Sequence, residues 1–162
     1  MALAAFALAS CAKKDGDGAA DAAATQDAVS VPAAVSAADV EAGINATFAK
    51  VHELLARGAS GAEVAEVLYE DDLTITGEGE KGLYPDLKSF IEPLHAYTRN
   101  PTCRLKVVDK VRHSGDLAAA WVAEHCDAHE KDAAEDYRMI YVFRNGPKGW
   151  RVTMEMFAVG NF

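Results

Sequence analysis

Residues 137–157, YRMIYVFRNGPKGWRVTMEMF, hold two stretches of alternating side chains joined by a segment rich in glycine. Such alternation predicts two β-strands, because successive side chains of a strand point to opposite faces of a sheet. The segment Arg144–Gly149 supplies the residues of a tight turn. We therefore predict an antiparallel hairpin at the end of the chain.

If Phe143 pairs with Trp150, the two faces of this hairpin differ sharply in polarity. The apolar face, which we expect in the core, carries Tyr137, Met139, Tyr141, Phe143, Trp150, Val152, Met154 and Met156. The reverse face, which suits water or a partner subunit, carries Arg138, Ile140, Val142, Arg144, Arg151, Thr153 and Glu155.

A second hairpin is predicted around Ser114-Gly115, with His113 facing Asp116 across a two-residue turn. Cys103 and Cys126 lie equally far from this turn along the chain, so the same register places them opposite each other. We predict a disulfide between them; two buried free thiols are the alternative. A disulfide would indicate an oxidising compartment.

The register of this hairpin also sorts its side chains. The inward set is Leu105, Val107, Val111, Ala118, Ala120 and Val122, and the outward set is Arg104, Lys106, Lys110 and Arg112. Glu124 falls on the inward side. A carboxyl group among apolar side chains would have its pKa raised by desolvation, as in a general base.

Helices are predicted before the hairpins. Ser36–Asp39 and Ser60–Glu63 are capping boxes, and the first precedes an apolar stripe at helical spacing: Val40, Ile44, Phe48, Val51 and Leu55. Residues 73–76, LTIT, alternate like a short strand. Pro85 suits the start of a third helix over Asp86–Tyr97, bent or ended near Pro93.

This order of elements, with Leu68-Tyr-Glu-Asp-Asp72 before the first strand and Gly149–Phe157 in the last, resembles the nuclear transport factor 2-like superfamily. More narrowly, it is similar to the SnoaL-like, ketosteroid-isomerase-like branch over Ala37–Phe162. The resemblance implies an α+β, cone-shaped fold: about three helices capping a strongly curved, mainly antiparallel sheet around a pocket. Family members often pair through the outer sheet face, where Val108 and Trp121 are the expected dimer contact.

The resemblance implies a ligand pocket lined by Tyr69, Glu124, Tyr137, Met139, Tyr141, Trp150, Met154 and Met156. At two positions where the family often has histidine, this chain has Met154 and Met156, and methionine cannot act as a general acid or base. We therefore expect binding of a small apolar or amphipathic molecule without catalysis. A filled cone acting as a protein-interaction module is a further alternative.

The enzymatic alternative is an isomerase, cyclase or dehydratase. Its general base would be Glu124 or Asp72 (or the adjacent Asp71), and Tyr137 or Tyr141 would polarise a carbonyl. No cofactor is predicted. His125, Asp127 and His129 alternate along one strand, too far apart to meet one zinc ion unaided, so we predict a solvated hairpin end and no metal site.

The first residues predict an exported, lipid-anchored protein. Leu8-Ala-Ser-Cys11 reads as a lipobox, with residues 1–10 as a signal segment and Cys11 as the lipidated residue; a disordered Ala-rich end is the alternative. Residues 11–36, rich in Ala and Asp, read as a disordered tether. Ala12 favours the outer membrane, and hence the cell envelope of a bacterium with two membranes.

The remainder, about 125 residues, suits one domain, predicted over residues 37–162. The formal net charge of −9 and the absence of a long basic cluster argue against binding to nucleic acid, because such binding relies on Lys and Arg to neutralise phosphates.

Overall fold

The computed structural model describes residues 35–162, except for the side chains of residues 95–97. The predicted signal segment, Cys11 and nearly all of the predicted tether lie outside the described residues. In chain order the elements are α1 (Ala37–Ala56), α2 (Gly61–Leu68), β1 (Tyr69–Gly77), α3 (Leu87–Tyr97), β2 (Arg104–Val107), β3 (Arg112–Ser114), β4 (Leu117–Cys126), β5 (Glu135–Gly146) and β6 (Gly149–Val159). No described helix has the length and apolar character needed to cross a membrane.

The helices begin where their capping residues predict. Ser36 and Ser60 each accept a hydrogen bond from the backbone N–H three residues later, and at α2 the Glu63 side chain accepts one from the Ser60 N–H. Asp86 caps α3 through the N–H of Ser89, and that helix continues past Pro93. The predicted helices are therefore confirmed.

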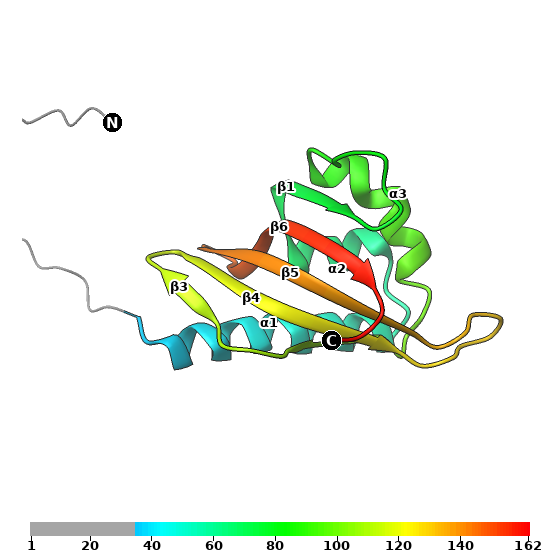
Figure 1. Cartoon of the computed structure of the whole chain (residues 1–162), viewed down its shortest axis with the longest axis horizontal. Helices are drawn as coiled ribbons and strands as arrows, with labels where there is room; N and C mark the ends of the chain where they lie inside the picture. The colour runs from blue at the N-terminus through cyan, green and yellow to red at the C-terminus, as the bar shows by residue number, and fades with distance from the viewer. Residues whose placement is uncertain (1–34) are drawn as a thin grey trace, which may run out of the picture. The chain divides into compact units, whose positions relative to one another are not determined.

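The six strands form one mixed sheet in the order β1-β6-β5-β4-β2, with β3 also paired to β4. Neighbouring strands are antiparallel except β1 and β6, which are parallel. Figure 1 shows α1 running along the sheet and α2 and α3 gathered at its β1 edge. This arrangement of three helices on an open sheet confirms the predicted α+β class.

The first hairpin has the predicted pairing at its far end but not at its turn. The turn is Gly115-Asp116, with Ser114 opposite Leu117, one residue later than predicted. Residues 108–111 absorb the two-residue difference, so that Arg104 pairs with His125 as expected. Because a two-residue shift keeps every side chain on its face, Glu124 still points inward.

The predicted disulfide is present. Cys103 and Cys126 are bonded, and both are buried at the end of β4. The bond ties the segment before β2 to the end of β4, beside the inward-facing Glu124.

The second hairpin departs from the prediction in two ways. Trp150 pairs with Asn145 rather than with Phe143, which pairs with Val152. This shift of two positions leaves the faces unchanged, but a β-bulge follows. Val142 is opposite Met154, so Thr153 is an extra residue in β6.

The bulge reverses the faces of the rest of β6. Met154 and Met156, predicted in the core, are 53% and 57% exposed, whereas Glu155, predicted on the reverse face, is only 5% exposed. The one-residue insertion is the physical reason, since side chains alternate along a strand and one extra residue inverts the pattern.

Trp150 lies in the core beneath α1. Gly43 of α1 packs directly on its indole ring, and the Thr47 hydroxyl donates a hydrogen bond of 2.8 Å to the Trp150 carbonyl. Trp150 therefore joins α1 to the sheet and does not line the cavity described below.

Candidate functional site

A cavity of about 170 Å³ lies between α3 and the inner face of the sheet. Its lining comes from β1, the β1–α3 segment, α3, β4, β5 and β6: Tyr69, Glu80, Phe90, Pro93, Leu94, Glu124, Tyr137, Met139, Tyr141, Glu155 and Phe157. The lining is mostly apolar and aromatic, and its few polar groups converge from four strands. This composition is typical of a small-molecule site.

Glu155 reaches the cavity because of the bulge at Thr153. Its carboxylate accepts a 2.9 Å hydrogen bond from the hydroxyl of Tyr69. Burial raises the pKa of Glu155 to about 8, although the hydrogen bonds from Tyr69 and Tyr141 act in the opposite direction. Near neutral pH this carboxyl group is therefore mainly protonated.

Glu124 reaches the same cavity from β4 and is 2% exposed. Burial, and secondarily the charge of Glu155, raise the pKa of Glu124 well above its ordinary value. Its Oε1 atom is buried and has no hydrogen-bond partner. Such an atom is costly to leave unsatisfied, so it marks the position where a ligand donor would be most favourable.

The tyrosines complete the polar part of the lining. Burial raises the pKa of both Tyr69 and Tyr141 well above the ordinary value, and the nearby Glu155 adds to the effect. Both hydroxyls therefore remain protonated hydrogen-bond donors. The Tyr137 hydroxyl donates to Glu135, near the end of the β4–β5 connection.

Arg151 fixes Tyr69 from the other side of β6. Its guanidinium donates to the backbone carbonyl of Tyr69 and lies 3.4 Å from Oε2 of Glu70. The side chain of Arg151 is almost fully buried. This charged anchor at the α2–β1 junction holds the Tyr69 ring over Glu155.

The cavity can be compared with the predicted pocket residue by residue. The cavity contains five of the predicted residues: Tyr69, Glu124, Tyr137, Met139 and Tyr141. Trp150, Met154 and Met156 do not line this cavity, because Trp150 packs under α1 and the bulge turns the two methionines outward.

Sequence reasoning missed Glu155, and Phe157 was the available signal. With unbroken alternation Phe157 would be an exposed aromatic residue, but after the bulge it lies on the inner face and lines the cavity. An exposed aromatic at the end of a regular strand indicates that its alternation has been interrupted upstream. The prediction also missed three lining residues of α3: Phe90, Pro93 and Leu94. The pairing of strands, from which the inward side chains were predicted, gives no information about a helix.

Asp72 lies outside the cavity. Its carboxylate is 2.9 Å from Nη1 of Arg144 and also accepts from the Thr153 hydroxyl, so it ties β1 to the bulge. The hydrogen bond from Arg144 holds the pKa of Asp72 below its usual range. Asp72 therefore joins β1 to the bulge through an ion pair and does not face the cavity, and its exposed neighbour Asp71 does not line the cavity either.

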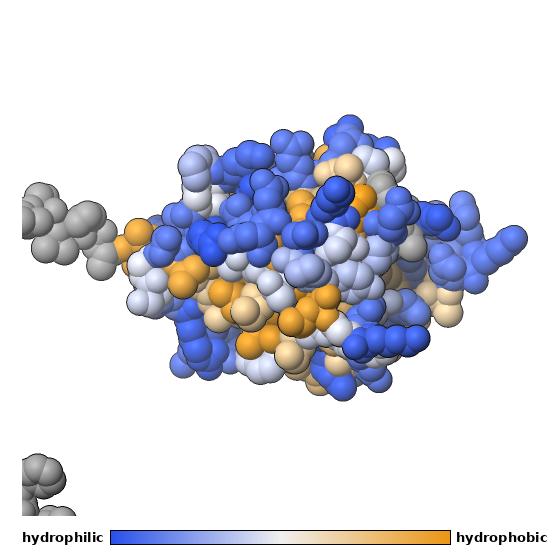
Figure 2. Space-filling model, turned by 90° about the horizontal axis from the view of Figure 1, so that it is seen from above, coloured by the Kyte–Doolittle hydropathy of each residue, from blue (hydrophilic) through white to orange (hydrophobic). Residues whose placement is uncertain are grey.

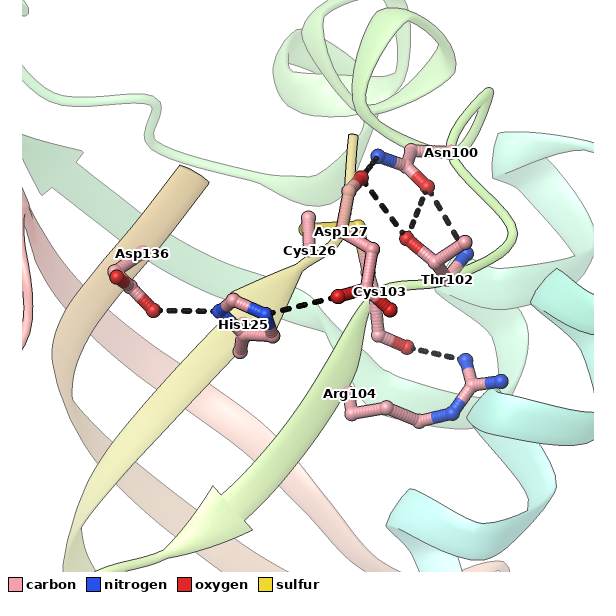
Figure 3. A network of polar contacts seen from close by, with 8 residues as sticks. All are labelled: Asn100, Thr102, Cys103, Arg104, His125, Cys126, Asp127 and Asp136. Carbon is pink, nitrogen blue, oxygen red and sulfur yellow. Dashed lines mark hydrogen bonds and ion pairs between the residues drawn. A yellow bond between two sulfur atoms is a disulfide. The ribbon is translucent and has the colours of Figure 1, made fainter. Parts of the chain in front are cut away.

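The far end of β4 carries a network of polar contacts around the disulfide (Figure 3). His125 lies between two aspartates, with Nδ1 2.8 Å from Asp136 and Nε2 3.2 Å from Asp127. The side chains of Asn100 and Thr102 both donate hydrogen bonds to the backbone carbonyl of Asp127. Hydrogen bonding to Asp136 and Asp127 raises the pKa of His125, because both carboxylates favour the protonated imidazole.

His129 takes no part in this network: its backbone pairs with Asp132 in the β4–β5 connection, and its Nε2 is 4.0 Å from Oε1 of Glu130. In the described part of the chain, the group of side chains with metal-ligand spacing is Cys103, Glu124 and Cys126. Its two sulfur atoms are bonded to each other and offer no thiolate.

The sequence matches no protein-family model and no curated protein. Solved structures of similar fold are found. An NTF2-like protein of unknown function from Methylobacillus flagellatus is 17% identical, with a TM-score of 0.57 over 78% of this chain and 96% of that one. A ketosteroid isomerase-like protein from Erwinia carotovora atroseptica is also 17% identical, with a TM-score of 0.55 over 75% and 97%.

A third structure, from Novosphingobium aromaticivorans, is an NTF2-like protein with a cystatin-like fold. It is 17% identical, with a TM-score of 0.57 over 75% of this chain and 82% of that one. At these identities the likeness concerns the fold alone.

Proposed function

From the NTF2-like, cystatin-like α+β fold of this domain, we propose that the chain binds a small apolar or amphipathic molecule in the cavity beneath α3. The observation that carries the proposal is the unpartnered Oε1 of Glu124, buried in a cavity that is otherwise mainly apolar. A ligand with one polar group would satisfy this atom, and its apolar body would contact the aromatic lining.

Native mass spectrometry of the full chain tests this proposal, in a Cys11→Ser background that carries no lipid and is purified without detergent. Met139 lines the cavity whereas Met156 is exposed on the opposite face, so Met139→Trp and Met156→Trp form a matched pair. We expect a bound small molecule, seen as excess mass over the denatured chain, in the wild type and in Met156→Trp but not in Met139→Trp. Bare chain in all three proteins, or equal occupancy in all three, would contradict the proposal.

Proton transfer is a second candidate function, favoured by Glu155. The sequence argument against catalysis relied on Met154 and Met156 as pocket residues, and the bulge removes both from the cavity. In their place stand two carboxyl groups beside tyrosine hydroxyls, which suits abstraction of a proton next to a carbonyl. Glu124 would act as base, and Tyr141 would donate a hydrogen bond to the carbonyl oxygen.

Deuterium exchange separates this candidate from binding alone. The molecule released from the cavity would be incubated with the protein in D₂O. We expect an enzyme to place deuterium on the carbon beside the carbonyl and Glu124→Gln to lose that exchange. Exchange at the same rate with Glu124→Gln would remove Glu124 as the base.

We also propose that the protein is an envelope lipoprotein, anchored through Cys11. The lipobox is the main support, and the Cys103–Cys126 disulfide is in keeping with an oxidising compartment. A clickable fatty acid fed to an expressing bacterium should label the wild type but not Cys11→Ser, and the label should sediment with the outer membrane. Labelling of the variant would refute this anchor.

Dimerisation through the outer sheet face is a further proposal. The Val108 N–H donates to the Trp121 carbonyl, and both side chains are 43% exposed. Figure 2 shows apolar side chains gathered on one face of the molecule among hydrophilic ones. Sedimentation equilibrium should give twice the chain mass for the wild type and the single mass for Trp121→Glu; a monomeric wild type would refute the dimer.

A further inference from the structure

The described lining of the cavity consists of apolar, aromatic and acidic side chains and includes no basic one. Among the lining residues that the structure describes, the ionisable carboxyls are Glu80, Glu124 and Glu155, and there is no lysine, arginine or histidine. The aromatic lining is formed by Tyr69, Phe90, Tyr137, Tyr141 and Phe157. Rings in this number, beside carboxyl groups, form the kind of surface that attracts a cation, because the face of each ring is negative.

Glu124 is the group that most needs a partner. Glu155 accepts a hydrogen bond from the Tyr69 hydroxyl, and Glu80, exposed at the cavity, accepts one from the Tyr84 hydroxyl. Oε1 of Glu124 accepts no hydrogen bond. A ligand that donates a charged hydrogen bond would satisfy it more strongly than a neutral donor, since charge-assisted bonds are about twice as strong as neutral ones.

Arg151, a buried cation among the described residues, does not supply that bond. Arg151 is directed to the Tyr69 carbonyl and to Glu70, on the other side of β6, and it does not line the cavity. The two inward carboxyls therefore have no positive counterpart in the described lining. Glu155 accepts a hydrogen bond from Tyr69, whereas Oε1 of Glu124 is buried without a donor, which costs free energy until a ligand supplies one.

We infer that the cavity binds a small organic cation, an amine with a compact apolar or aromatic body, whose ammonium group contacts Glu124. This inference rests on the proposed binding function and names its ligand class. On binding, the ammonium group donates a charge-assisted hydrogen bond to Oε1 of Glu124, the buried atom that has no partner. An anionic ligand would meet no positively charged side chain in the described lining.

Calorimetric titration of the full chain with three probes of one size tests the ligand class. The probes are benzylamine, benzyl alcohol and benzoate, which carry a cation, a neutral donor and an anion on the same ring. At neutral pH we expect benzylamine to bind about ten-fold more tightly than benzyl alcohol, and benzoate to bind most weakly.

Variants assign the effect to Glu124. Glu124→Gln should weaken benzylamine about ten-fold and leave benzyl alcohol unchanged. Glu41→Gln, the same change at an exposed site of α1, should bind all three probes like the wild type. Circular dichroism of each variant checks that it is folded.

The outcomes separate the inference from the function on which it rests. Equal binding of benzylamine and benzyl alcohol, or a full benzylamine preference in folded Glu124→Gln, would overturn the organic cation and leave the binding pocket standing. Failure of all three probes to bind at about 10 mM, together with bare chain in native mass spectrometry, would overturn both.

Discussion

The hydroxyl of Tyr69 donates a 2.9 Å hydrogen bond to Glu155 and so joins the first residue of β1 to the last strand inside the cavity. Both side chains are buried. Glu155 consequently occupies a site of low dielectric, where its neutral form is favoured and its pKa rises to about 8. This relationship makes the stability of the domain dependent on pH in a predictable direction.

We predict that Glu155→Gln stabilises the domain at alkaline pH. Between about pH 4.5, near which the unfolded carboxyl titrates, and pH 8, the folded state keeps a proton that the unfolded state loses. Folding stability therefore falls as pH rises through this window, by about 1.4 kcal/mol per pH unit. Glutamine imitates the protonated acid and has nothing to titrate, so the variant's advantage in free energy of unfolding should grow from pH 4.5 to pH 8.

Urea unfolding at several pH values measures this advantage. Glu53→Gln, an exposed substitution on α1, serves as the control and should follow the wild type at every pH. A constant difference between Glu155→Gln and the wild type across the window would show that Glu155 titrates normally.

We predict a different signature for Tyr69→Phe. Removing the hydroxyl deletes a buried hydrogen bond, which should cost about 1–2 kcal/mol of folding free energy near pH 5. Because that bond favours the charged form of Glu155, its loss should also raise the pKa of Glu155. Urea unfolding near pH 5 measures the lost free energy, and carbon-13 NMR of labelled glutamate carboxyls measures the pKa. An unchanged or lowered pKa of Glu155 would contradict the bond.

The sequence predicts the first hairpin better than the second for a definite reason. In the first hairpin the turn was displaced by one residue, but residues 108–111 introduce two extra positions, an even number. Faces were therefore preserved, and both the cysteine pair and the inward Glu124 were predicted correctly. In the second hairpin Thr153 adds one position, an odd number, and every later side chain changes face.

The bulge depends on contacts far apart in the sequence. Asp72 of β1 accepts a hydrogen bond from Thr153, the extra residue, and forms an ion pair with Arg144 on the neighbouring strand. The Arg151 side chain donates a hydrogen bond to the Tyr69 carbonyl. None of these contacts can be read from periodicity within residues 137–157. Local capping rules, by contrast, needed only neighbouring residues, so the helix starts at Ser36 and Ser60 were predicted correctly.

Lysine substitutions test the reversed faces of β6 directly. Met156→Lys should change the free energy of unfolding by no more than about 0.5 kcal/mol, because its side chain is exposed. Val152→Lys, on the same strand but before the bulge, should destabilise by about 3 kcal/mol or more, because it would bury an unpaired charge. Urea unfolding measures both, and a severe effect of Met156→Lys would mean that the side chain faces the core.

Loss of the disulfide should be costly. Replacing Cys103 and Cys126 together by alanine opens a loop whose ends are 23 residues apart. In the chain-entropy model the expected loss of stability is about 3 kcal/mol. Urea unfolding of the double variant against the oxidised wild type measures it, and peptide mass mapping without reductant should recover the two cysteines as one cross-linked species; alkylation of both would refute the bond.

We predict that α1 packs too closely on the sheet to tolerate a larger residue at Gly43. An added Cβ would lie 2.5 Å from Cδ1 and 2.9 Å from Nε1 of Trp150, and that ring is buried and cannot move away easily. Alanine in a helix is intrinsically better than glycine by about 1 kcal/mol, but overpacking costs about 1–3 kcal/mol. We expect Gly43→Ala to lower the free energy of unfolding and to alter the tryptophan fluorescence, because the ring must shift.

Gly82→Ala is the control. Its added Cβ meets no atom within 4 Å, so the fluorescence and the urea midpoint should stay close to those of the wild type. Equal behaviour of the two variants would show that α1 does not pack on Trp150.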